Sequence, residues 1–294
     1  MKRLFFAIAL VAVSCLSMSA YATDSQSDSS SKPEAPERQG WEEDIPLYGD
    51  VESVVVTTYK LEDKFGEVVR GDIEDCEKYY FNKAGNVFEK AEYFSNGSLY
   101  NKHIYKYNAS GNRIEEAWYN SDGSLRDKYI YKYDASVNMV EWAKYNSGGS
   151  LNNKGIYKYD TSGNMIEKAK YWSDGSLWEK YIWKYDASGN KIEEAYYYLD
   201  GPLDCKCVYK YDSAGKCIEE AWYNSDGSLW LKNIYKYDAS GNMIERAVYD
   251  SDGSLFDKYI YKYDALGNII EESRYYGETL WPDRQTVYEI TYRK

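Results

Sequence analysis

The chain has 294 residues, with 36 lysines and arginines against 48 aspartates and glutamates, so its net charge is −12. A nucleic-acid partner would have to overcome this negative charge, and we therefore exclude one and attribute the acidity to solubility. Thirty-five tyrosines and nine tryptophans indicate that any core is aromatic rather than aliphatic.

Residues 1–22 have the pattern of a signal peptide. Lys2 and Arg3 precede an apolar run from Leu4 to Val13, and Ala20-Tyr21-Ala22 supplies a small-x-small cleavage pattern. The run is too short to span a bilayer, and no longer apolar run follows it. We therefore expect a secreted, periplasmic or cell-surface protein without a transmembrane segment. An alternative is a lipoprotein signal that ends at Cys15.

Residues 23–45 are rich in Ser, Asp, Glu and Pro. Such a segment buries too little apolar surface to offset the entropy of ordering it. We expect a disordered tether here, and a folded array over residues 46–294.

A unit of 26 residues repeats through this array. Its most regular marker is a tyrosine that recurs without insertion, and Phe81 extends the series backward by one step; the tyrosines are Tyr107, Tyr133, Tyr159, Tyr185, Tyr211, Tyr237 and Tyr263. Two turn signals divide each unit, as in Asp186–Asn190 and Ser173–Ser176, and runs rich in β-forming aromatic residues lie between them. The sequence predicts an all-β fold in which about eight β-hairpin units and degenerate caps form a long antiparallel, twisted or spiralling, solenoid-like sheet.

The glycines of both turns predict three-residue loops that end in a left-handed residue and a G1 bulge. Val137 replaces one of these glycines, which predicts a different turn type there. Counted outward from the loops, Tyr181 faces Ala195 and Ile166 faces Ile182. This register places a constant tyrosine ladder on one face of the sheet.

The other face then carries the isoleucines and the positions that vary between units. Six tryptophans fall on it and form the candidate ligand-binding set: Trp118, Trp142, Trp172, Trp178, Trp222 and Trp230. Aromatic rings beside polar side chains suit sugar rings or peptide chains. We expect this face to bind a glycan or an extracellular protein. The alternative is that the tryptophans cover the isoleucines in a core, in which case the array is only a structural spacer.

No residue pattern indicates catalysis, a cofactor or a metal, so we do not expect an enzyme. His103 is the only histidine and stands where the next unit has Tyr129, which indicates a ladder substitution. Cys205, Cys207 and Cys217 are poorly placed for disulfides, and with Cys76 they are expected to be buried residues or free thiols. A metal site at these three cysteines and calcium binding at the turn aspartates are weaker alternatives.

The motif Y-x-Y-D-x-x-G-N, as in Tyr157 to Asn164, resembles the YD repeat of Rhs proteins. The units that begin at Tyr157, Tyr235 and Tyr261 match it in full, whereas Asn108, Val137 and Lys216 depart from it. The resemblance implies an exported or cell-surface protein with a long spiralling sheet, and members are often regarded as carbohydrate-binding. The large members form shells around a toxin. This chain looks too short to enclose one, so we expect at most a fragment-like relative of such shells.

Overall fold

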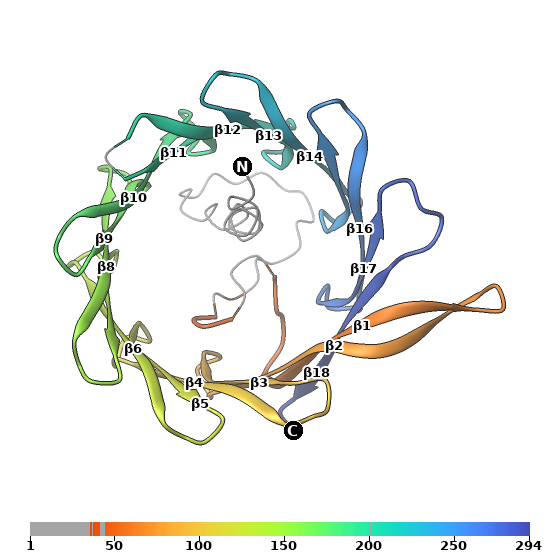
Figure 1. Ribbon diagram of the computed structural model, residues 1–294, viewed down its shortest axis with the longest axis horizontal. Coiled ribbons are helices and arrows are strands. Elements are labelled where there is room, and N and C mark those ends of the chain that lie inside the picture. Colours follow the sequence, from red (N-terminus) through yellow and green to blue (C-terminus); the bar gives the residue numbers. More distant parts are fainter. Residues whose placement is uncertain (1–35, 37, 42–44, 200) are drawn as a thin grey trace.

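The computed structural model describes residues 36, 38–41, 45–199 and 201–294, in which eighteen antiparallel strands form one ring (Figure 1). The predicted signal peptide and most of the predicted tether lie outside the described residues. In chain order the strands are β1 (Val51–Lys64), β2 (Glu67–Phe81), β3 (Val87–Tyr93), β4 (Leu99–Tyr107), β5 (Arg113–Asn120), β6 (Leu125–Tyr133), β7 (Met139–Asn146), β8 (Leu151–Tyr159), β9 (Met165–Trp172), β10 (Leu177–Tyr185), β11 (Lys191–Tyr198), β12 (Leu203–Tyr211), β13 (Cys217–Asn224), β14 (Leu229–Tyr237), β15 (Met243–Asp250), β16 (Leu255–Tyr263), β17 (Ile269–Tyr276) and β18 (Arg284–Tyr292). No helix of the described residues is long and apolar enough to cross a membrane.

The ring closes at a seam between the first strand and the last. Each strand pairs with its neighbours in sequence, and β1 also pairs with β18, with Val56 opposite Tyr288 and Thr58 opposite Thr286. The expected hairpin units are confirmed, but the expected open, spiralling or solenoid-like sheet is wrong. The fold is a closed barrel, because the two degenerate ends of the array pair with each other and leave no free edge.

The hairpin loops have the predicted three-residue form. The amide of Asp186 donates to the carbonyl of Asn190 at 2.9 Å, and the amide of Gly189 donates to the carbonyl of Asp186 at 3.1 Å. Gly189 has a φ of 83°, as the G1 bulge requires. At Val137 the predicted change of turn type is wrong, since its φ is 70° and its amide donates to Asp134 as in the glycine loops. The loop therefore imposes the left-handed conformation on a β-branched residue.

A second bulge, two residues beyond the loop in the hairpins between β2 and β17, shifts the register. Tyr185 pairs with Lys191 but Lys184 pairs with Glu193, so Ile192 is an extra residue. As a result Tyr181 lies opposite Tyr196 instead of Ala195, and in the other hairpin Ile182 lies opposite Glu167 instead of Ile166. A shift of one residue moves a strand's side chains to the opposite face.

The predicted division of the aromatic residues between two faces is therefore wrong. Trp118 lies opposite His103, Trp142 opposite Tyr131, and Trp222 opposite Cys207. These three tryptophans share the face of the tyrosine ladder. The physical reason is the second bulge, which no turn signal marks in the sequence.

The recurring tyrosine of each unit bonds next to this second bulge. The hydroxyl of Tyr185 donates to the carbonyl of Met165 at 2.7 Å, and Met165 is the residue that pairs with Tyr159 beside the bulge. The same bond joins Tyr133 to Arg113, Tyr159 to Met139, Tyr211 to Lys191, Tyr237 to Cys217 and Tyr263 to Met243. A bulge locally interrupts the hydrogen bonds between two strands. Each of these tyrosines therefore provides a hydrogen-bond donor, from the next unit, to a carbonyl that lies beside a bulge.

The tyrosine face is the inner wall of the barrel. Residues 38–41 and 45–49, which we call the inner strap, lie within the ring (Figure 1), and the hydroxyl of Tyr107 donates to the carbonyl of Gln39 at 3.1 Å. Trp41 is 6% exposed and packs edge-on against Tyr79 at 4.8 Å between ring centroids. This described part of the expected tether is packed against the wall. The outer wall carries exposed ion pairs such as Lys184–Glu193, at 2.6 Å.

Candidate binding site

The structure distributes the six candidate tryptophans over three places. Trp118 and Trp142 lie on the inner wall and are connected through Tyr129, with ring centroids 5.2 and 6.0 Å apart. Trp222 and Trp230 belong to an aromatic and thiol cluster on β12–β14. Trp172 and Trp178 lie at one rim of the barrel, where their rings stack at 4.4 Å and 17°.

Trp118 is covered by its neighbours. The His103 ring stacks on it at 4.6 Å, and the guanidinium of Arg126 lies over it at 4.8 Å. Its indole N–H donates to the Glu116 carboxylate. Trp118 is therefore part of the wall, and the His103 and Arg126 side chains cover part of its ring.

Trp222 is only 4% exposed and lies among three thiols. Cys76, Cys205, Cys207 and Cys217 are free cysteines, and burial raises the pKa of Cys205 and of Cys217 to about 12. Thiols with such pKa values stay protonated and unreactive at neutral pH. Within the described residues, no group of three or more His, Cys, Asp or Glu side chains is placed to hold a metal ion.

The rim that carries Trp172 also carries other exposed aromatic residues. In an antiparallel ring every second hairpin loop lies at the same end, so the loops after β3, β5, β7, β9, β11, β13, β15 and β17 share one rim. Three contacting ring pairs flank these loops, and we call them the aromatic rim: Phe94–Tyr100 at 4.8 Å, Trp172–Trp178 at 4.4 Å and Phe256–Tyr276 at 5.7 Å. Phe94 is 50% exposed and Trp172 is 39% exposed. The tryptophan pattern alone does not reveal the Phe and Tyr members at the same loop positions.

Fixed polar groups stand beside the rings of the aromatic rim. The Asp174 carboxylate, in the loop between Trp172 and Trp178, accepts hydrogen bonds from the amide of Ser176 at 2.9 Å and from its hydroxyl at 2.6 Å. These bonds hold the pKa of Asp174 below its ordinary value. The same bonds lower the pKa of Asp122, Asp226 and Asp252 in other loops of this rim. The rim therefore combines flat rings with ionised carboxylates and hydroxyls.

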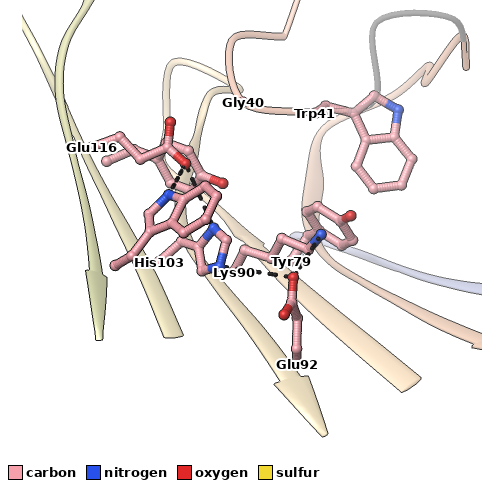
Figure 2. A pocket seen from close by; sticks show the side chains of 9 residues that line it. Gly40, Trp41, Tyr79, Lys90, Glu92, His103 and Glu116 are labelled. Carbon is pink, nitrogen blue, oxygen red and sulfur yellow. Dashed lines mark hydrogen bonds and ion pairs between the residues drawn. The ribbon is translucent and has the colours of Figure 1, made fainter. Parts of the chain in front are cut away.

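A second feature is a hollow of about 370 Å³ between the inner wall and the strap (Figure 2). We call it the inner hollow, and its lining residues are Gly40, Trp41, Tyr79, Lys90, Glu92, His103, Tyr105, Glu116 and Trp118. The Lys90 ammonium lies 2.8 Å from Glu77 and 3.2 Å from Glu92. His103 lies between two carboxylates, with Nε2 3.7 Å from Glu92 and Nδ1 3.5 Å from Glu116.

The carboxylates of the inner hollow are ionised. Burial opposes this, but a hydrogen bond from Asn101 and the charge of Lys90 bring the pKa of Glu92 below its ordinary value. The pKa of Glu116 is lowered in the same way, against burial, by His103 and Arg113 and by bonds from Trp118 and Tyr131. His103 pairs with Trp118 on the inner wall, so its predicted ladder position is confirmed. The sequence did not reveal the hollow, because Trp41 was assigned to a tether.

Comparisons with known proteins yield weak matches. A family model described only as an uncharacterised protein matches residues 160–275, and no curated protein matches the chain. Similar solved structures include TcdB2-TccC3-TEV, at 13% identity over 78% of this chain with a TM-score of 0.34, and a Tc holotoxin pore of Photorhabdus luminescens, at 13% over 78% with a TM-score of 0.32. This chain spans only 15% of each of those chains.

A porin-like protein from Bacteroides uniformis is also similar. It is 9% identical over 82% of this chain and 98% of its own, with a TM-score of 0.45. We transfer no activity from any of these structures. The YD-repeat resemblance of the sequence stays a prediction.

Proposed function

We propose that the protein is an exported, non-catalytic binding protein whose aromatic rim recognises a neutral glycan. The observation that carries this proposal is the Trp172–Trp178 pair, two stacked indoles at 4.4 Å of which Trp172 is 39% exposed. Asp174 and Ser176, in the loop between them, present a carboxylate and a hydroxyl. This combination of an open aromatic surface and fixed polar groups suits sugar rings.

The chemistry of the rim favours a neutral ligand. Stacked rings cover the C–H faces of a sugar, and carboxylates and hydroxyls bond to its hydroxyl groups. The ionised side chains of Asp122, Asp174, Asp226 and Asp252 repel anionic lipid headgroups and nucleic acids. The folded core does not require large exposed rings, and clustered exposed apolar groups are typical of interaction surfaces.

The aromatic rim offers several contacts to one ligand. Phe94–Tyr100 and Trp172–Trp178 each flank one loop, and Phe256–Tyr276 joins two neighbouring loops of the same rim. A polysaccharide therefore meets similar chemistry more than once around the rim. Weak contacts linked in one chain raise the overall affinity well above that of each contact. We therefore expect polysaccharides to bind more tightly than short oligosaccharides.

A glycan array with the purified full chain, followed by calorimetry, tests the proposal. Trp172→Ala and Trp178→Ala each remove about 0.5–1.5 kcal/mol of aromatic contact, which weakens binding of a neutral polysaccharide roughly 2- to 12-fold. Phe88→Ala is the matched control, since Phe88 is 44% exposed but lies outside the aromatic rim, on β3.

Two results contradict the proposal. Wild-type protein that binds no neutral glycan overturns it and leaves a structural spacer as the remaining role. Equal losses of affinity in Phe88→Ala and in the two tryptophan variants show that the rim has no special part in binding.

A further inference from the structure

We infer that the inner hollow is a binding subsite for one neutral sugar residue, with Nε2 of His103 as its hydrogen-bond anchor. The class of ligand rests on the proposed function, whereas the site rests on different residues. These residues are separate from the aromatic rim and belong to β2–β5 and the inner strap.

His103 has hydrogen-bonding capacity that the described residues do not use. The side chain lines the inner hollow and is 7% exposed, and within the described residues its Nε2 has no hydrogen-bond partner. A buried polar atom without a partner is destabilising and rare in native folds. The Glu92 carboxylate lies 3.7 Å from Nε2, which is beyond hydrogen-bond distance. A ligand hydroxyl supplies the missing partner.

The charges around the inner hollow favour a neutral ligand. Glu77, Glu92 and Glu116 outnumber the cations Lys90 and Arg113 that pair with them, so an anionic ligand is repelled. A cationic amine gains little, because Lys90 and Arg113 already pair with Glu92 and Glu116. These two carboxylates also accept hydrogen bonds, Glu92 from Asn101 at 3.0 Å and Glu116 from Tyr131 at 2.8 Å. A neutral hydroxyl both donates and accepts, so it can bond to Nε2 of His103 and accept from Lys90.

The inner hollow has the size and the apolar surface that a single sugar residue requires. Its volume of about 370 Å³ is at the small end of the roughly 300–1,000 Å³ of ligand pockets, which suits a single sugar residue. Trp41 and Tyr79 meet edge to face at one side of it (Figure 2) and present apolar ring surface to the C–H groups of a sugar.

The inner hollow and the aromatic rim share one hairpin. Tyr100 of the rim and His103 lie on β4, three residues apart, which is about 10 Å at ~3.3 Å per residue. On the paired strand β3 lies Glu92, and Phe94 is the first residue after that strand. The hairpin β3–β4 therefore connects a ring pair of the rim to the hollow.

The repeat supplies a test variant that preserves the fold. Positions equivalent to His103 hold Tyr129, Gly155, Tyr181, Cys207, Asn233 and Tyr259, so His103→Tyr places a residue that this barrel already accepts there. The larger ring fills the inner hollow. Tyr129→His is the matched control, since it places an imidazole in the next unit, away from Trp41.

The experiment uses the only histidine as a reporter. In full-length protein labelled at histidine, the His103 imidazole gives one NMR signal, which is followed during titration with glucose, galactose, mannose and N-acetylglucosamine. We expect a saturable shift with at least one sugar, retained in Trp172→Ala. We also expect His103→Tyr, in which calorimetry replaces the lost imidazole signal, to weaken the binding of that sugar at least tenfold, while polysaccharide binding at the rim persists.

Each outcome bears on one of the two proposals. An imidazole signal that none of the four sugars moves overturns the inference, and rim-dependent glycan binding in the same protein leaves the proposed function standing. A shift caused by acetate or methylammonium but by no sugar overturns the ligand class. A sugar-dependent shift, in a protein whose polysaccharide binding is unchanged by the rim variants, supports the inner hollow and overturns the rim. If His103→Tyr fails to fold, His103→Asn, after Asn233, takes its place.

Discussion

At the scale of single residues, the repeat shows where the backbone constrains the side chain. Equivalent loop positions carry a left-handed glycine, for example Gly163 with a φ of 86° and Gly189 with a φ of 83°. Val137 takes the same place with a φ of 70° and is 54% exposed. Its side chain therefore contributes little burial, while its backbone conformation costs about 1–2 kcal/mol.

Replacing Val137 by Gly is expected to stabilise the protein by about 1 kcal/mol. The relief of left-handed strain exceeds the roughly 0.5–1 kcal/mol that glycine's flexible unfolded state costs. Urea unfolding of wild type and Val137→Gly measures the difference. The matched control, Gly163→Val, introduces the same strain one unit later and is expected to destabilise by a similar amount. A destabilised Val137→Gly would contradict this account.

At the scale of the hairpin, the loops follow from their sequence but the strands beyond them do not. The Asp186 carboxylate accepts bonds from the amides of Ser188 and Asn190, an interaction that Asp and Asn make in turns generally. The bulge at Ile192 leaves no such local signature. The Lys191 carbonyl beside this bulge accepts a hydrogen bond from the hydroxyl of Tyr211 in the following unit. In the sequence this tyrosine is visible only as a residue that recurs every 26 positions.

Tyr185→Phe is expected to destabilise the barrel by about 1–3 kcal/mol. The substitution keeps the ring and removes only the hydroxyl that bonds to the Met165 carbonyl, so the acceptor loses its donor. Hydrogen exchange at β9 and thermal unfolding measure the effect. Tyr197→Phe is the control, because Tyr197 is on the outer wall, where it pairs with Lys180, and we expect a change within about 0.5 kcal/mol. Equal behaviour of the two variants would argue against a role for the bond.

At the scale of the whole molecule, the inner strap bridges the seam. The amide of Gln39 donates to Asn86 in the loop after β2 at 3.1 Å, and the amide of Tyr48 donates to Asn268 in the loop after β16 at 2.5 Å. Trp41 joins Val51 and Val54 of β1 and Tyr79 and Phe81 of β2 in one buried cluster. The strap therefore ties the first and last units together beside the β1–β18 ladder.

Trp41→Ala is expected to cost about 3–5 kcal/mol, as for other buried aromatic residues, and to expose the seam. Chemical denaturation measures the loss, and hydrogen exchange locates it at β1, β2 and β18. Trp281→Ala is the control, because Trp281 is 58% exposed and its truncation is expected to stay within about 0.5 kcal/mol. Unchanged stability of Trp41→Ala would show that the strap has no part in holding the barrel closed.

The sequence by itself determined the hairpin unit, its 26-residue period and its loop type, because turn chemistry depends on a few adjacent residues. It also placed His103 correctly in the ladder, since the copies align without insertion. Only the tertiary structure decided the faces, because one bulged residue, such as Ile192 or Trp178, reverses every side chain beyond it. The tertiary structure also decided the closure of the barrel and the presence of the inner hollow. Both depend on contacts between distant segments, β1 with β18 and Trp41 with Tyr79.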